Sequence, residues 1–267
     1  MKIIQGGVCA AQGFKANGIH CGIRKNHSKK DLALIVSEIP ASTAAVYTTN
    51  LVKGAPLTVT KNNIADGIAQ AMICNSGNAN TCNANGIEIA EAMCGLVSEH
   101  TGICVKNVVV ASTGVIGQPL DLTPIENGME ELVKGLSVEA AADAAQAIMT
   151  TDTVPKEVAV EFTVGGKTCR MGGIAKGSGM IHPNMATMLV FITTDAKISA
   201  EMLQKALSAD IQKTFNMISI DGDTSTNDMV TVLANGMADN DEIVGGGVAV
   251  NADHVKGLLN VCGECLL

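Results

Sequence analysis

The sequence predicts an α/β (α+β) fold in which a layered sheet core is covered by outer helices. Short apolar runs typical of strands alternate along the chain with stretches of helical periodicity. The 267 residues are 47% hydrophobic and 16% charged, so the chain can bury a large core and lacks the composition of a disordered protein. At this length we expect one large domain or two modest ones.

Five apolar runs that end at polar, Gly or Pro residues predict strands. They lie at 32–39, 71–74, 108–111, 188–193 and 229–234. A further run at 157–164 alternates strictly between apolar and more polar positions and is followed by Gly165 and Gly166. Two glycines adopt the positive φ angles of a two-residue turn without strain, so this segment predicts a β-hairpin.

Helices are expected between these strands. The apolar positions of residues 89–97 fall on one helical face. Thr123 and Glu126 have the spacing of a capping box, with a proline in the first helical position. An Ala-rich helix is expected from Ser137 to Met149, and Ser199 is expected to cap a later helix.

The composition also excludes several classes of partner. There are 18 Lys+Arg against 26 Asp+Glu, which gives a net charge of −8 and no general attraction to nucleic acid or anionic lipid. Without Trp and with one Tyr, the chain has few aromatic rings on which bases could stack. No secretion signal is evident, and no run approaches the ~18 apolar residues that span a bilayer. We therefore expect a cytoplasmic protein, with neither nucleic acid nor a membrane as partner.

The sequence contains no complete motif for a metal ion or a common cofactor. Asp221 begins a segment that looks like a calcium loop, but Thr226 and Val232 stand where that loop needs Gly and Glu. A turn with local side-chain contacts is the favoured interpretation, and the wall of a site is the alternative. The nine cysteines are expected to be reduced, and Cys262 with Cys265 makes at most half a zinc site. No dinucleotide fingerprint, phosphate loop or serine-hydrolase elbow is present.

One loop, at residues 172–189, is unusual because it is apolar and rich in glycine. Its four glycines permit close approach of backbone, Pro183 stiffens a turn, and Thr187 stands where the loop meets the next predicted strand. Composition alone favours a buried bend in which the Thr187 hydroxyl is satisfied. The alternative is a hydroxyl held on a rigid scaffold for chemistry.

Residues 176–189 closely resemble the cleavage-site motif of the ornithine acetyltransferase (glutamate N-acetyltransferase) family of arginine biosynthesis. Other segments resemble the family in the same order along the chain. They are 13–15, 30–35, 48–50, 75–80, 112–117, 150–153 and 221–228. The resemblance covers nearly the whole chain and favours the chemical interpretation of Thr187.

The resemblance implies a self-cleaving enzyme of the N-terminal-nucleophile type. Cleavage between Ala186 and Thr187 would give an α chain of residues 1–186 and a β chain of residues 187–267. The Thr187 hydroxyl would attack the preceding carbonyl group and would afterwards be the catalytic nucleophile. Its freed α-amino group, with an ordinary pKa of about 7.7–8.0, could then serve as the general base.

The family also implies roles for other residues. Thr113 and Gly114 match its oxyanion pair, while Thr153, Lys176 and Thr187 match positions that contact substrate. Acetyl would pass from N2-acetylornithine to L-glutamate through acetyl-Thr187, with no metal and no cofactor. Acetyl-CoA as a second donor stays open, and the family implies a hetero-oligomer of α and β chains.

The sequence departs from the family at its end. Members continue through an Asp-Gly-Glu-Gly-type segment and a tail that contribute substrate-binding residues, and this sequence stops at Leu267 without that segment. We therefore expect an incomplete substrate pocket and little transferase activity from residues 1–267. Two alternatives stay open: a related aminopeptidase or amidase, in which water replaces glutamate, and an inactive, truncated remnant that binds an amino acid or acyl donor.

Overall fold

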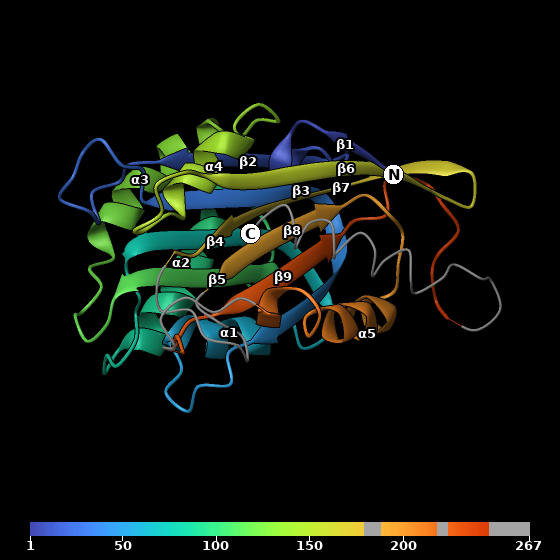
Figure 1. The fold of residues 1–267 in the computed structure, drawn as a ribbon. Helices are drawn as coiled ribbons and strands as arrows, with labels where there is room; N and C mark the ends of the chain where they lie inside the picture. Colours follow the sequence, from blue (N-terminus) through green and yellow to red (C-terminus); the bar gives the residue numbers. More distant parts are fainter. Residues whose placement is uncertain (179–187, 218–223, 246–267) are drawn as a thin grey trace.

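The computed structural model describes residues 1–178, 188–217 and 224–245, and the described strands form one nine-stranded sheet (Figure 1). The strands are β1 (Lys2–Ile4), β2 (Phe14–Ile19), β3 (Leu32–Tyr47), β4 (Ile68–Asn78), β5 (Val108–Val115), β6 (Lys156–Val164), β7 (Lys167–Lys176), β8 (Leu189–Thr194) and β9 (Met229–Ala234). Their order across the sheet is β1-β6-β7-β8-β9-β3-β4-β5, and β2 pairs with β3 outside this path.

The long strand β3 joins the two parts of the sheet. Its first half pairs antiparallel with β2 and β4, and its second half pairs antiparallel with β9. The register with β4 shifts between Val36 and Ala41, around Pro40, which has no N–H to donate to a ladder. The two parallel pairs, β4 with β5 and β8 with β9, therefore lie on either side of β3.

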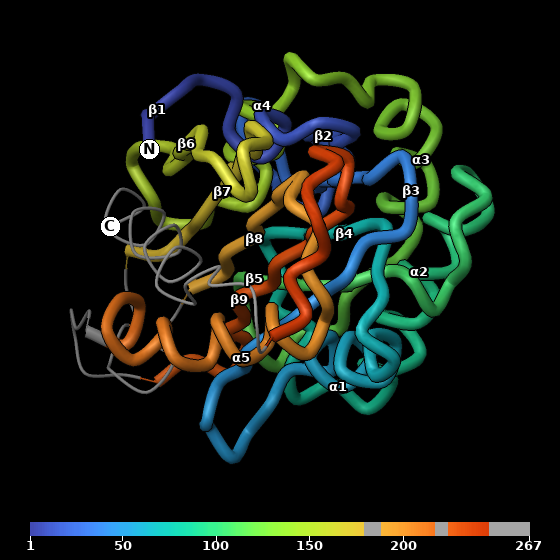
Figure 2. The backbone as a smooth tube through the Cα atoms, turned by 90° about the vertical axis from the view of Figure 1, so that its right-hand side faces the viewer, coloured from blue at the N-terminus to red at the C-terminus, as the bar shows by residue number. Residues whose placement is uncertain are grey.

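Five helices pack around the sheet within the described residues. They are α1 (Ala55–Asn63), α2 (Gly86–Thr101), α3 (Thr123–Lys134), α4 (Ala141–Ala147) and α5 (Ala200–Asp210), with short 3-10 turns at η1 (Gly7–Cys9), η2 (Val105–Asn107) and η3 (Phe215–Met217). Figure 2 shows α4 next to β2, and α5 apart from α2 and α3. The layered arrangement with outer helices confirms the predicted fold class.

Aliphatic side chains fill the core, which divides into three clusters. Helices α1 and α2 pack against β4 and β5, and α3 packs against β2, β3 and α2, with side chains such as Met93 and Leu132 in one cluster. Helix α5 packs against β3, and its side chains, such as Leu207, form a cluster with those of β6 to β9. The third cluster holds the two largest fully buried side chains, Phe14 and Phe191, against α4. The scarcity of aromatic residues is thus offset by dense packing of Ala, Val, Ile, Leu and Met.

Most predicted strands are confirmed. The run at 229–234 is β9, and the other runs fall within β3, β4, β5 and, from residue 189, β8. The hairpin between β6 and β7 turns at Gly165 and Gly166, whose φ angles are +55° and +81°. Strands β1 and β2 and helix α1 were not predicted, because their apolar patterns are short or interrupted.

Two helix starts are wrong and one is confirmed. Thr123 is not a capping residue but lies inside α3, and its N–H donates to Asp121 Oδ1 at 3.0 Å. Ser137 does not begin a helix, since its backbone bonds to Ala16 of β2 and α4 starts only at residue 141. Ser199 caps α5 as predicted, and its hydroxyl accepts the N–H of Met202 at 3.3 Å.

No helix in the described ranges combines the length and the apolar character that crossing a membrane requires.

Two Gly→Ala substitutions test the packing. A methyl group on Gly172 of β7 would lie 1.7 Å from the Gly7 carbonyl oxygen, whereas one on Gly95 of α2 meets nothing within 4 Å. We expect Gly172→Ala to lower the free energy of unfolding by at least about 1–3 kcal/mol. Gly95→Ala should raise it by up to about 1 kcal/mol, because alanine favours helix. Urea unfolding of both variants checks this, and equal effects would contradict the close approach of β7 to η1.

Candidate active site

The oxyanion pair predicted by the resemblance lies at the end of β5, where two strands approach unusually closely. Gly114 pairs with Gly77 of β4, and the register shifts just beyond them. Gly114 has a φ of +134°, and a Cβ there would lie 2.3 Å from the Gly77 carbonyl carbon. Only glycine fits this conformation and contact. Thr113, one residue earlier, is 7% exposed. The bulge thus turns Thr113 inward and leaves Gly114 at the surface.

Lys176 reaches this corner from the end of β7. Its ammonium Nζ donates a hydrogen bond to Thr113 Oγ1 at 3.2 Å, and the residue is 4% exposed. Burial lowers the pKa of Lys176, while the negative charge of Asp152, and that of Asp228 when it is ionised, act in the opposite direction. Since Lys176 donates to the Thr113 oxygen, the hydroxyl proton of Thr113 remains available to another acceptor.

Asp152 holds the backbone just after β7. Its Oδ1 accepts the N–H of Gly177 at 2.8 Å and the ammonium of Lys156 at 2.7 Å. Its Oδ2 accepts the N–H of Thr150 at 3.1 Å. Burial favours the neutral acid, but the contacts with Lys156, Gly177 and Thr150 outweigh it and lower the pKa of Asp152. A buried carboxylate thereby fixes residue 177 beside Lys176.

Asp228 holds the backbone just before β8. Its Oδ1 accepts the N–H of Met188 at 2.8 Å, and the residue is 1% exposed. Burial raises the pKa of Asp228 to about 8, against the lowering effects of the Met188 amide, the Ser225 hydroxyl and the charge of Lys176. Asp228 is therefore largely protonated at neutral pH, an unusual state for a carboxyl group.

Asn227 joins the segment before β9 to the oxyanion corner. Its Nδ2 donates to the carbonyl oxygens of Ala79 at 2.7 Å and Ser112 at 3.0 Å. Its Oδ1 accepts the hydroxyl groups of Thr81 and Thr226, each at 2.6 Å. Residues 221–228 are interpreted from the sequence as a turn with local contacts or as the wall of a site, and in the described part Asn227 makes both local and long-range contacts. Residues 221–223 lie outside the described residues.

The remaining predicted residues are divided between a cavity and the undescribed segment. Thr153 lines a cavity of about 450 Å³ together with Thr151, Asp152 and residues of the loop before β3. Ala186 and Thr187, the predicted cleavage residues, lie outside the described residues, as do Cys262 and Cys265. The structure brings Thr113 and Lys176 together, and the roles assigned to them stay predictions.

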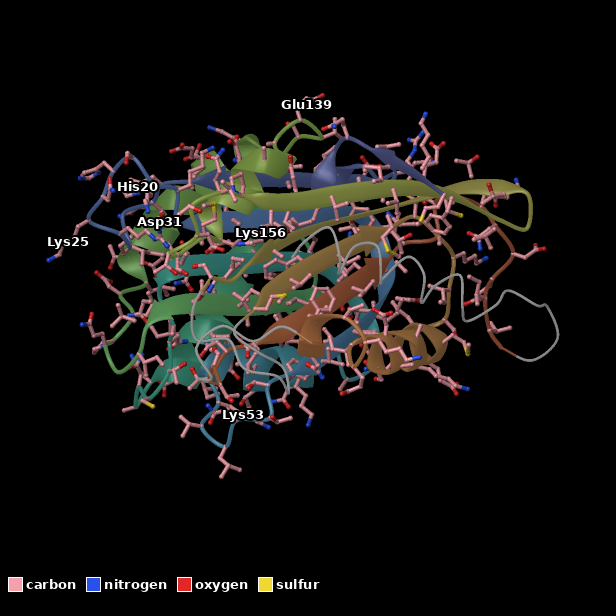
Figure 3. The ribbon with its side chains drawn as sticks, in the orientation of Figure 1. His20, Lys25, Asp31, Lys53, Glu139 and Lys156 are labelled. Carbon is pink, nitrogen blue, oxygen red and sulfur yellow. The ribbon has the colours of Figure 1, made fainter. Side chains whose placement is uncertain are left out.

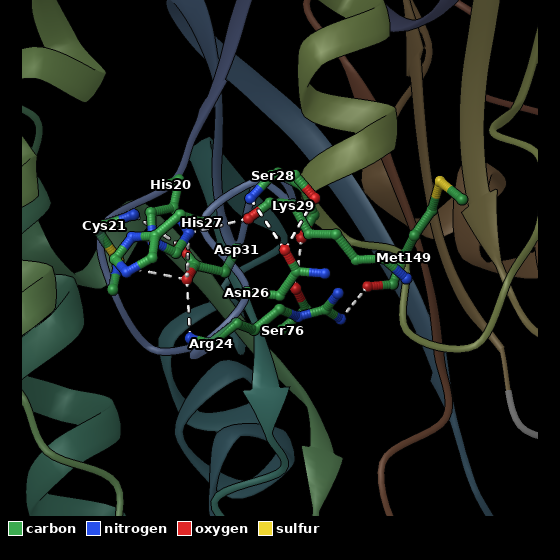
Figure 4. A network of polar contacts seen from close by, with 12 residues as sticks. His20, Cys21, Arg24, Asn26, His27, Ser28, Lys29, Asp31, Ser76 and Met149 are labelled. Atoms are coloured by element: carbon green, nitrogen blue, oxygen red, sulfur yellow. Dashed lines mark hydrogen bonds and ion pairs between the residues drawn. The ribbon is translucent and has the colours of Figure 1, made fainter.

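The loop before β3 is organised around one buried carboxylate (Figure 4). Asp31 Oδ1 accepts the N–H of Cys21 at 2.7 Å. Its Oδ2 accepts the N–H of Arg24 at 2.9 Å and lies 3.2 Å from His20 Nδ1. The Arg24 guanidinium then donates to the carbonyl oxygen of Met149. Sequence analysis did not single out Arg24, Asp152 or Asp228 as site residues, because each makes a contact with a distant part of the chain, at Met149, Gly177 and Met188 respectively.

Within the described part of the chain, no three His, Cys, Asp or Glu side chains are grouped so that they could hold a metal ion.

Several solved structures share this fold. One is an L-aminopeptidase D-Ala-esterase/amidase from Ochrobactrum anthropi, described as a variant of the Ntn (N-terminal-nucleophile) hydrolase fold, with a TM-score of 0.59 over 100% of this chain and 86% of that one. At 11% sequence identity this likeness shows the fold alone. The architecture is thus of the α/β Ntn type.

The sequence comparisons are more specific. The model of the ArgJ family matches residues 15–262, and the chain belongs to this family. It is 51% identical to the arginine biosynthesis bifunctional protein ArgJ of Symbiobacterium thermophilum over 248 residues, 92% of this chain and 62% of that protein. It is 50% identical to the protein of the same name from Listeria monocytogenes over 90% of this chain and 60% of that protein. The chain thus spans about 60% of the length of these curated relatives.

Two solved structures of relatives support the same family membership. The arginine biosynthesis bifunctional protein of Bacillus halodurans is 48% identical, with a TM-score of 0.66 over 70% of this chain and 97% of that one. An ornithine acetyltransferase from Mycobacterium tuberculosis, solved in complex with ornithine, is 32% identical, with a TM-score of 0.60 over 70% of this chain and 99% of that one. The family is one of bifunctional enzymes of arginine biosynthesis, and the expected family membership is confirmed.

The raised pKa of Asp228 makes the stability of the fold depend on pH. Asp228 keeps its proton in the folded state up to about pH 8, but an aspartate in an unfolded chain loses it near about pH 3.9. The contribution of protonated Asp228 to the free energy of unfolding is full below about pH 4, and it is lost as the pH rises towards 8. Asp228→Asn removes this titration and keeps an oxygen for the Met188 amide. We expect the variant to gain stability relative to wild type across that window.

Urea unfolding at several pH values measures the difference. Asp239→Asn, at an exposed aspartate beyond β9, is the matched control. Parallel pH profiles for wild type and Asp228→Asn would contradict the account of Asp228.

Proposed function

We propose that this chain carries the acyl-transfer site of an ornithine acetyltransferase, which moves acetyl from N2-acetylornithine to L-glutamate through an ester on Thr187. The observation that carries the proposal is the buried hydrogen bond between Lys176 Nζ and Thr113 Oγ1. It joins the predicted oxyanion residues to the strand that leads into the predicted cleavage loop. Membership of the ArgJ family and the structural likeness to an ornithine acetyltransferase support the proposal.

Maturation begins with the Thr187 hydroxyl. Its oxygen attacks the Ala186 carbonyl carbon, the Ala186–Thr187 amide bond breaks, and the released nitrogen takes the hydroxyl proton. Water then hydrolyses the new ester, which frees the carboxyl group of Ala186 and restores the hydroxyl. The products are an α chain of residues 1–186 and a β chain of residues 187–267 with a free α-amino group.

The same hydroxyl then accepts acetyl. The α-amino group of Thr187 takes its proton while the oxygen attacks the acetyl carbon of N2-acetylornithine, and the proton passes to the departing ornithine nitrogen. The Thr113 hydroxyl and the Gly114 N–H stabilise the oxyanion, and losing one such donor typically costs about 10²–10³ in rate. The glutamate amine then attacks the ester and regenerates Thr187.

The substrates meet charged and hydroxyl groups that the structure describes. Lys176 is a cation suited to the carboxylate of either amino acid, and Thr153 contributes from the cavity wall. One acetyl amide is broken and one is made, so the reaction balances without a cofactor. The proposal includes acetyl-CoA as a second acetyl donor. It also includes assembly of the α and β chains into a hetero-oligomer.

A second candidate reaction uses the same ester. The fold is shared with an aminopeptidase that is described as an Ntn hydrolase variant, and in such an enzyme water would take the place of glutamate. Ornithine release that requires glutamate favours the transferase, whereas acetate release without glutamate favours the hydrolase. Binding of an amino acid without cleavage or turnover would favour the truncated binding remnant.

Self-cleavage is tested by intact mass under denaturing conditions. Wild type should give two pieces that sum to the 27.4 kDa chain plus one water. Thr187→Ala should give one uncut chain, and Thr187→Ser, which keeps a hydroxyl, should still be cut. Thr113→Val should slow cleavage by about 10²–10³ if Thr113 stabilises the oxyanion. An uncut wild-type chain, or cleavage of Thr187→Ala, would overturn the proposed maturation.

A further inference from the structure

The cavity beside the candidate active site has a charge imbalance. It measures about 450 Å³, and its walls combine the loop before β3 with the segment that follows α4. Its charged lining residues are Arg24, Lys29, Lys30 and Asp152. A cluster of three cations is unexpected in a chain whose net charge is −8.

Two of these charges are neutralised by neighbours. Lys30 Nζ lies 2.5 Å from Asp143 Oδ1, and Asp152 Oδ1 lies 2.7 Å from Lys156 Nζ. Arg24 and Lys29 have no carboxylate within salt-bridge distance among the described residues. The cavity therefore presents two cations that have no direct ion pair among the described residues, and an anion is the ligand that would complete it.

Arg24 is held in place rather than free to turn away. Its backbone N–H is fixed by Asp31, which is fully buried, and its guanidinium donates to the Met149 carbonyl oxygen (Figure 4). That bond uses one of five guanidinium donors. Burial lowers the pKa of Arg24, an effect that Asp31 and Asp152 oppose, so the cation is partly desolvated. A pre-positioned, partly desolvated guanidinium is suited to bind a carboxylate.

The cavity adjoins the candidate active site at two places. The Arg24 side chain packs against Gly77, so closely that a Cβ on Gly77 would lie 3.0 Å from Arg24 Cγ. Gly77 in turn pairs with Gly114 of the oxyanion corner. On the other wall, Asp152 bonds to Gly177, which follows Lys176. The cavity therefore borders the oxyanion corner through Gly77 and the end of β7 through Gly177.

We propose that Arg24, assisted by Lys29, binds the side-chain carboxylate of the acidic amino acid that accepts the acetyl group, with the cavity as its subsite. This inference rests on the proposed function, in which the acceptor is glutamate. The donor's ornithine side chain ends in an ammonium group, which the two cations repel. The two substrates therefore place their side chains differently, and Arg24 determines the specificity for the acceptor.

Binding of L-glutamate, measured by calorimetry, tests the proposal, with L-glutamine as a neutral probe of the same shape. Arg24→Gln should weaken glutamate binding by about tenfold or more, because a charge-assisted hydrogen bond is lost, while glutamine binding stays unchanged. Lys29→Gln should have a smaller effect in the same direction. Arg24→Lys, which keeps the charge, should recover part of the affinity.

Lys25→Gln is the matched control, because Lys25 lies at the outer edge of the same loop and does not line the cavity (Figure 3). It should bind glutamate as wild type does. In wild type, added salt should weaken glutamate binding more than glutamine binding, a test that needs no variant.

Three results would overturn the proposal: wild-type affinity in Arg24→Gln, equal affinity of wild type for the two amino acids, or no glutamate binding at all. Arg24-dependent binding of inorganic pyrophosphate that is tighter than that of glutamate would also overturn it, by assigning the cavity to phosphate groups. Intact mass separates the two hypotheses. If the chain is cut at Thr187 but glutamate binding does not depend on Arg24, only the proposed subsite is ruled out. If glutamate binding depends on Arg24 but the chain is not cut, only the proposed function is ruled out.

Discussion

The contact between Gly77 and Gly114 is the constraint on which the candidate site depends. Strand β5 cannot carry a side chain at this crossing, because a Cβ on Gly114 would lie 2.3 Å from the Gly77 carbonyl carbon, and the φ of +103° at Gly77 favours glycine on β4 as well. The resulting bulge turns Thr113 inward to meet Lys176. The other face of Gly77 receives the stem of Arg24. Loops that are distant in sequence therefore converge on one corner of the sheet.

Two buried carboxyl groups then fix the backbone on either side of the predicted cleavage bond. Asp152 accepts the N–H of Gly177, and Asp228 accepts the N–H of Met188, each at 2.8 Å. They differ in charge, because Asp152 is paired with Lys156 while burial dominates at Asp228. One ionised and one largely protonated acid thus flank Lys176, and this limits the cost of burying its ammonium without neutralising it completely. The arrangement fixes both ends of a segment in which small displacements would matter for chemistry.

Local patterns in the sequence predicted the parts of the fold that local forces determine. The glycine pair at 165–166 marked its hairpin, and Ser199 marked the start of α5, since turns and caps depend on adjacent residues. The predicted helix start at Ser137 was wrong for the opposite reason, because the backbone of Ser137 pairs with Ala16, more than a hundred residues away. The meeting of Thr113 and Lys176 was anticipated only through the family resemblance. Asp228 and Arg24 were missed because burial and long-range partners decide their roles.

The most direct test of the central claim, that Thr187 carries the acetyl group, is a single-turnover labelling experiment. The protein is incubated briefly with N2-acetylornithine in the absence of glutamate and then analysed by peptide mass spectrometry. The account predicts one added acetyl group on the peptide that begins with Thr187, bound as an ester that hydroxylamine removes and that glutamate discharges. A cleaved, folded protein with no ester on Thr187, or with the acetyl group on another residue, would contradict it.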